Sequence, residues 1–302
     1  MGGSIGFLCG LFMCHHLNWR VVGYYDGKIL AIEEAVKPRD CVFLDVDIFR
    51  KEIASVGHHM VLFNKRQMPE NWEQFDSCLQ PNILRGYDFK QEFRLKYPLA
   101  TIHLLLSIIG VHLKVQLPAS ALHPLLFTDG TYNVLFSYPE NVLQWLDYLN
   151  VGSSGNPLKS VLMNTSVTVH ELMKGMDGFF AKRNLLNVKG MRGDQLKLSS
   201  TSGGPINVDQ NGKTFCISPG IVALKSEFLQ LLASGTGWRF NESNWTWNGL
   251  VIRQFSKSNF TGQKRRLNGT TFMNLLEKNP LSWAITAGNE LEYTLEEPDS
   301  IA

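Results

Sequence analysis

The chain has 302 residues, 44% of them hydrophobic and 19% charged, with a formal net charge of +2. This length and composition indicate a folded protein with one large or two modest domains, and they exclude a disordered chain. The near-neutral charge excludes a protein-wide basic surface for nucleic acid, so any such contact must be local. The five cysteines form no C-x-x-C pair, which predicts free thiols in a reducing cytoplasm.

Strand and helix patterns alternate near the amino terminus. The run Cys41–Leu44 is continuously apolar and is closed by an aspartate, as a buried parallel strand would be. Such alternation predicts an α/β domain. In chain order, we expect a helix over Phe7–Leu17, strands over Arg20–Tyr25 and Cys41–Leu44, a short helix over Ile48–Ala54, and a return to the sheet at Ser55–Val56.

Downstream patterns continue this mixture. The stretches at 5–13 and 99–113 are apolar but too short to span a bilayer, so we expect no membrane segment. The second of them is instead predicted to be a buried helix. Further helices are expected at Glu140–Leu149 and Glu171–Lys182, and strands at Leu125–Phe127, Val134–Tyr138 and Ser160–Val169.

A segment rich in Ser, Gly, Asn and Pro, residues 199–212, predicts a domain linker. It would separate a parallel-sheet α/β domain at 1–198 from a smaller α+β domain at 213–302. A boundary at 152–157 remains an alternative.

Two acidic and two histidine side chains follow neighbouring predicted strands. Asp45 and Asp47 come at the end of the first strand, and His58 and His59 follow the second. Ligands in open α/β sheets bind beyond the carboxyl ends of the strands, so these side chains should share one rim. Carboxylate with imidazole suits Mn²⁺ or Mg²⁺, and two such ions can activate water against a phosphate. A helix cap at Asp45 and a polar His-His loop are the plainer alternatives.

The order of helix, strand, strand ending in Asp, strand and His-His resembles the DHH phosphoesterase superfamily. The resemblance implies a two-domain phosphodiester hydrolase that uses two Mn²⁺ ions and acts on oligonucleotides or nucleotides. Asp45 would match the second metal motif, and His58 and His59 the histidines of the Asp-His-His signature. Position 57 is Gly where that signature has Asp, and the first motif has no counterpart in MGGSI. We therefore expect a truncated or degenerate first element.

Two alternatives use the same residues. A degenerate phosphoesterase fold could bind a nucleotide or nucleic acid without cleaving it. The run FLDVD also resembles the nucleophile strand of haloacid dehalogenase-type phosphatases, with Asp45 as nucleophile and Asp47 as acid/base. That alternative requires a hydroxyl at a second strand end, for which Thr165 or Ser166 is available.

Substrate contacts are expected from basic residues. Lys264, Arg265 and Arg266 are consecutive cations, and a single-strand binding surface needs cations together with aromatic rings that stack on bases. Nearby rings that could stack are those of Trp238, Trp245, Trp247, Phe255 and Phe260. Solvated loop cations and core tryptophans are the plainer explanation. A second basic group could contact phosphate beside the metal rim, or simply solvate a helix: Arg85, Lys90, Arg94 and Lys96.

Overall fold

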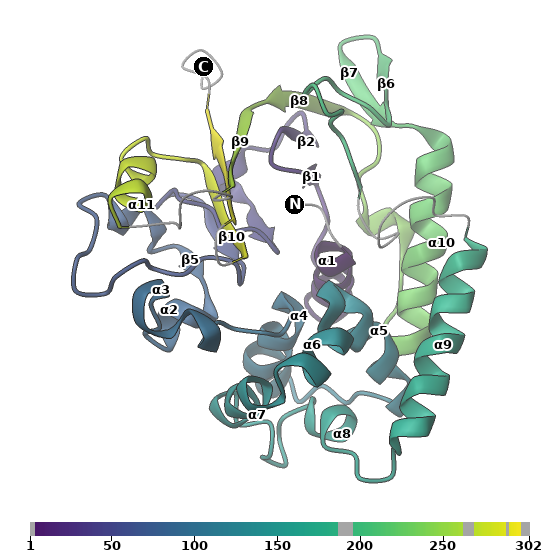
Figure 1. The fold of residues 1–302 in the computed structure, drawn as a ribbon. Helices are drawn as coiled ribbons and strands as arrows, with labels where there is room; N and C mark the ends of the chain where they lie inside the picture. Colours follow the sequence, from purple (N-terminus) through teal and green to yellow (C-terminus); the bar gives the residue numbers. More distant parts are fainter. Residues whose placement is uncertain (1–3, 187–195, 262–268, 288–289, 297–302) are drawn as a thin grey trace.

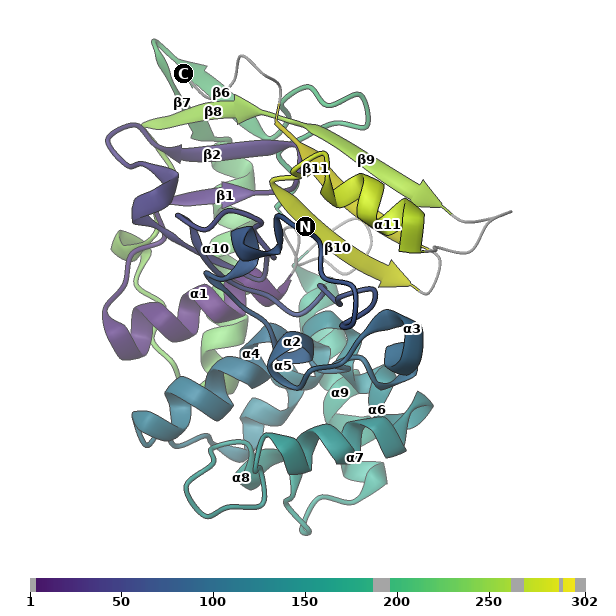
Figure 2. The same ribbon diagram turned by 90° about the vertical axis from the view of Figure 1, so that its left-hand side faces the viewer.

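The computed structural model describes residues 4–186, 196–261, 269–287 and 290–296. The chain forms a mixed α/β structure, which confirms the predicted class at this coarse level. Figures 1 and 2 show helices α4 to α8 gathered on one side and the sheets on the other. The helices in chain order are α1 (Ser4–Leu17), α2 (Pro81–Leu84), α3 (Phe89–Glu92), α4 (Thr101–Leu105), α5 (Leu122–Phe127), α6 (Thr131–Ser137), α7 (Pro139–Tyr148), α8 (Lys159–Leu162), α9 (Val169–Leu185), α10 (Pro219–Thr236) and α11 (Gly269–Leu276).

The described strands form three sheets. The largest is antiparallel. The predicted parallel pairing of the Cys41–Leu44 and Ser55–Val56 strands is confirmed in a small parallel sheet of three strands. The antiparallel sheet has the order β1 (Gly23–Tyr25), β2 (Ile29–Glu33), β8 (Leu250–Gln254), β7 (Thr214–Ile217), β6 (Val208–Asn211). The parallel sheet has the order β3 (Val42–Leu44), β4 (Ala54–Val56), β5 (Cys78–Leu79). A second antiparallel sheet has the order β10 (Ser282–Ala287), β11 (Glu290–Leu295), β9 (Ser256–Thr261).

Several local predictions were wrong. The expected strands at 125–127, 134–138 and 160–169 are α5, α6 and α8 with a following turn. Short apolar runs do not distinguish a buried strand from a buried helical turn, and these runs pack between helices. The expected helix at 48–54 is an irregular segment. It is held by a bridge between Ile48 and Ser282 of β10.

Strands from both sides of the predicted linker share the five-stranded sheet. β1 and β2 precede residues 199–212, β7 and β8 follow them, and β6 lies inside them. The division into two domains stays a prediction.

Two cores position the elements around the candidate site. In the larger, α1 is buried along most of its length and packs against α4, α10 and the turn at Thr128–Gly130. In the smaller, Phe49 and Met60 of the segment between β3 and α2 pack with Phe272 and Trp283 of the C-terminal part. The second antiparallel sheet is thereby fixed against the loops that leave β3 and β4. Within the described ranges, the helices include none that is long and apolar enough to cross a membrane.

Candidate metal centre

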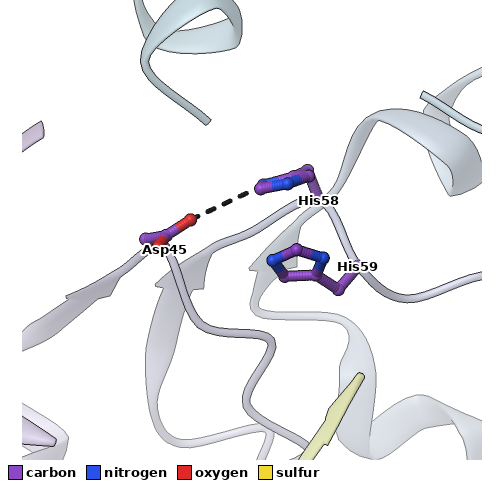
Figure 3. A group of neighbouring side chains, drawn as sticks. All are labelled: Asp45, His58 and His59. Carbon is purple, nitrogen blue, oxygen red and sulfur yellow. Dashed lines mark ion pairs between the residues drawn. The ribbon is translucent and has the colours of Figure 1, made fainter. Parts of the chain in front are cut away.

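Asp45, His58 and His59 lie together at the carboxyl ends of β3 and β4. One ligand atom from each residue falls within 4.8 Å of the others. Parallel pairing of Leu44 with Val56 brings the two strand ends to the same edge, as the sequence predicts. Figure 3 shows Asp45 and His58 facing one another, with His59 beside them. The group could hold a metal ion, and the geometry does not determine which one.

His58 is held through both ring nitrogens. Its Nδ1 lies 2.7 Å from Thr101 Oγ1, and its Nε2 lies 3.0 Å from Asp129 Oδ2. The Thr101 hydroxyl donates to Asp45 Oδ1 at 2.9 Å, so it accepts from His58 Nδ1. The Asp129 carboxylate at Nε2 accepts a second ring proton, so these contacts favour the imidazolium form of His58. Burial alone lowers the pKa of His58, but Asp129 and Asp45 outweigh that effect and raise it.

Asp45 is buried at the end of β3, and its backbone is left-handed at φ 64°. Its amide still donates to Val56 O at 2.7 Å, which completes the β3–β4 pairing. Burial raises the pKa of Asp45 to about 7, although the charge of His58 acts in the opposite direction. Strained backbone and a destabilised carboxylate are common at binding sites, where a ligand stabilises the charge.

Asp47 lies behind the group of three ligands. Its Oδ2 accepts from the backbone amide of His59 at 2.9 Å, and the Cys78 thiol lies 3.7 Å from its Oδ1. Burial raises its pKa to about 6. Asp47 therefore positions the His59 loop and leaves direct coordination to its neighbours.

The same carboxylate explains Gly57. A Cβ at position 57 would lie 2.4 Å from Asp47 Oδ1 and 2.6 Å from its Cγ. The Asp47 carboxylate occupies the space that a side chain at 57 would need. An aspartate at 57, as in the DHH signature, would not fit beside Asp47.

We expect Gly57→Ala to destabilise the protein by about 1–3 kcal/mol, because the new methyl group forces buried Asp47 or the His59 loop to move. Chemical denaturation of the variant measures this loss. Gly155→Ala is the matched control, since a Cβ there meets nothing within 4 Å. Equal stabilities of the two variants would contradict the packing.

Two further residues at the site were missed by sequence reasoning, and a third was a candidate phosphate contact. Thr101 begins α4, and Asp129 lies in a short turn with a left-handed backbone at φ 53°. A Thr-Asp-Gly turn gives no chemical signal until the fold brings it to His58. Lys96, one of the four basic candidates, donates to Ile285 O at 2.5 Å. Burial lowers its pKa to about 8, while Asp129 and Asp47 act in the opposite direction.

Other residues predicted to contact substrate either pack elsewhere or lie outside the described residues. Arg85 lies over the rings of Tyr87, Trp145 and Tyr148 at 4.6–5.0 Å, so it packs within the helical part. Lys264, Arg265 and Arg266 lie outside the described residues. Three tryptophans that were candidates for stacking bases, Trp238, Trp245 and Trp247, are core residues.

The haloacid dehalogenase alternative gains no support. The strand that would carry Thr165 or Ser166 is absent, and α8 with a turn takes its place. Thr165 lines a pocket with Gln116 and Pro157.

Comparison with known proteins finds no match to this chain. No protein-family model matches the chain, and neither a curated protein nor a solved structure matches it.

Proposed function

We propose that this protein is a metal-dependent phosphodiester hydrolase related to the DHH phosphoesterases and acting on an oligonucleotide or nucleotide substrate. The observation that carries the proposal is the buried group of Asp45, His58 and His59 at the ends of two parallel strands. A single histidine, His58, faces the carboxylates of both Asp45 and Asp129, so a divalent cation would balance the negative charge that remains.

The donor set fits Mn²⁺ or Mg²⁺, with the imidazoles favouring Mn²⁺. A bound ion would lower the pKa of a water and stabilise charge on phosphate. The protein's own part is to hold the ligands: Thr101 and Asp129 fix the ring of His58, and Asp47 fixes the loop of His59. A second ion, as in two-metal hydrolases, would have to draw on Asp129, whose Oδ2 lies 3.0 Å from His58 Nε2.

A binding protein without catalytic activity is the second candidate. The described residues supply a group of three ligands, enough for one ion, and Asp47 fills the place of a side chain at 57. Hydrolysis of short oligonucleotides and of a generic phosphodiester with Mn²⁺ separates the two. Turnover that Asp45→Ala abolishes supports the hydrolase, and specific binding without turnover supports the second candidate.

We also propose how the chain is organised around the site and where the protein is located in the cell. We infer that the small parallel sheet forms a DHH-like metal centre and that the chain after residue 212 contributes to substrate binding. All five cysteines are free, which supports a reducing compartment such as the cytoplasm.

Metal affinity is expected to rise with pH. At pH 6 Asp45, with a pKa of about 7, and His58, with a raised pKa, both hold protons. A metal ion must displace these protons, so affinity should increase about tenfold per pH unit for each proton released. Isothermal titration with Mn²⁺ between pH 6 and 8, in buffers of different ionisation enthalpy, measures affinity and proton release together. Affinity that is constant over this range would contradict the assignment of these ligands.

A further inference from the structure

A small cavity lies where the candidate metal centre meets the second antiparallel sheet, whose residues Trp283 and Ile285 donate to Asp47 O and His59 O. Asp45, Asp47 and His59 line one wall. The opposite wall comes from β9, β10 and β11, which the smaller core fixes in place. A volume of about 20 Å³ gives room for about one water-sized group. Any ligand of a metal ion bound here must therefore meet the side chains of the second wall.

The second wall carries a cation, Lys257 of β9. Its ammonium group pairs with Glu292 Oε2 of β11 at 2.6 Å. The two side chains are only 15% and 27% exposed. Because water reaches this pair so little, removing one partner would leave the other charge poorly solvated, unlike in an ion pair on the open surface.

The stem of Lys257 is fixed by Gly27. A Cβ at Gly27 would lie 3.0 Å from Lys257 Cδ, so the lysine lies directly across the turn between β1 and β2. That turn is tied to the same sheet, because Thr294 donates to Gly27 O at 2.7 Å. Lys257 is therefore held at the cavity from two sides.

We propose that Lys257 is the phosphate-binding residue of this site, and that Glu292 neutralises its ammonium group until phosphate displaces the carboxylate. This rests on the proposed function. An ammonium group opposite a metal centre suits a phosphoryl oxygen, because phosphate carries charge that both cations can share. Because the cavity has room for only about one water-sized group, phosphate can reach Lys257 only if the Glu292 carboxylate moves away. Contact through a phosphoryl group also agrees with the burial of the three tryptophans that would otherwise stack bases.

The test is a titration of the Mn²⁺-loaded protein with inorganic phosphate. Lys257→Met keeps the apolar stem and removes the charge, so we expect phosphate affinity to fall at least tenfold while Mn²⁺ affinity stays within about threefold. Glu292→Gln removes the competing carboxylate, so phosphate should bind about threefold tighter or more. A purely structural ion pair would instead make both variants bind more weakly. Lys213→Met, in the exposed turn between β6 and β7, is the control and should match wild type.

Phosphate affinity of Lys257→Met equal to that of wild type would overturn this inference. Weaker phosphate binding by Glu292→Gln would overturn the displacement step. If wild type binds no Mn²⁺, the proposed function fails, and the same phosphate series on the metal-free protein then decides the role of Lys257.

Discussion

Replacing Asp45 by Asn is expected to reduce Mn²⁺ affinity at least a hundredfold and to abolish metal-dependent turnover. Asn keeps an oxygen that can accept from the Thr101 hydroxyl, now 2.9 Å from Asp45 Oδ1, but it lacks the negative charge that a hard cation requires. The variant should therefore bind Mn²⁺ more weakly while its fold stays intact. Calorimetric titration and circular dichroism of the same samples measure both.

The same variant should be more stable than wild type when no metal is present. The pKa of Asp45 is about 7 in the folded protein and about 4 in an unfolded chain. A carboxyl with a raised folded-state pKa stabilises the fold below pH 4 and loses that contribution as pH rises to 7. The advantage of Asp45→Asn in denaturant midpoint should therefore grow between pH 4 and 7. If the variant is less stable than wild type at pH 8, the charged Asp45 carboxylate stabilises the fold, and its raised pKa is contradicted.

His58→Ala is expected to have the largest effect on stability, about 3 kcal/mol at pH 8. The His58 ring lies 3.6 Å from Asp45 and 3.0 Å from Asp129, and its side chain is 3% exposed. Its removal leaves the buried Asp45 carboxylate without the neighbouring ring that favours its charged form, which is costly in the protein interior. The cost should shrink at pH 5, where Asp45 can take up a proton. Urea denaturation at both pH values measures the difference.

His59→Ala is the matched comparison. Burial lowers the pKa of His59 well below its usual value, so this ring is neutral and balances no carboxylate. We expect a loss of at least tenfold in Mn²⁺ affinity with only about 1 kcal/mol in stability. Equal destabilisation by the two alanine variants would contradict the different roles assigned to the adjacent histidines.

The site could be predicted from the sequence where it depends on strand ends. Cys41–Leu44 and Ser55–Val56 do pair in parallel, and this pairing alone brings Asp45 beside His58 and His59. Metal-type residues after consecutive strands are a local signal with a direct geometric consequence.

The remaining contacts depend on tertiary packing that the sequence does not display. Asp129 reaches His58 across 71 positions from a turn flanked by α5 and α6, two helices that were expected to be strands. Lys257 and Glu292 reach the cavity only because β9–β11 packs on Phe49 and Met60. The antiparallel character of the largest sheet could not be predicted either, since β2 pairs with β8 more than two hundred residues later.

The most direct test of the metal centre is a crystal soaked in Mn²⁺ and measured at the manganese absorption edge. The account predicts an anomalous peak about 2.0–2.3 Å from Asp45, His58 and His59. The peak should disappear in Asp45→Asn. A wild-type crystal with manganese only elsewhere, or with an unchanged peak in the variant, would contradict the account.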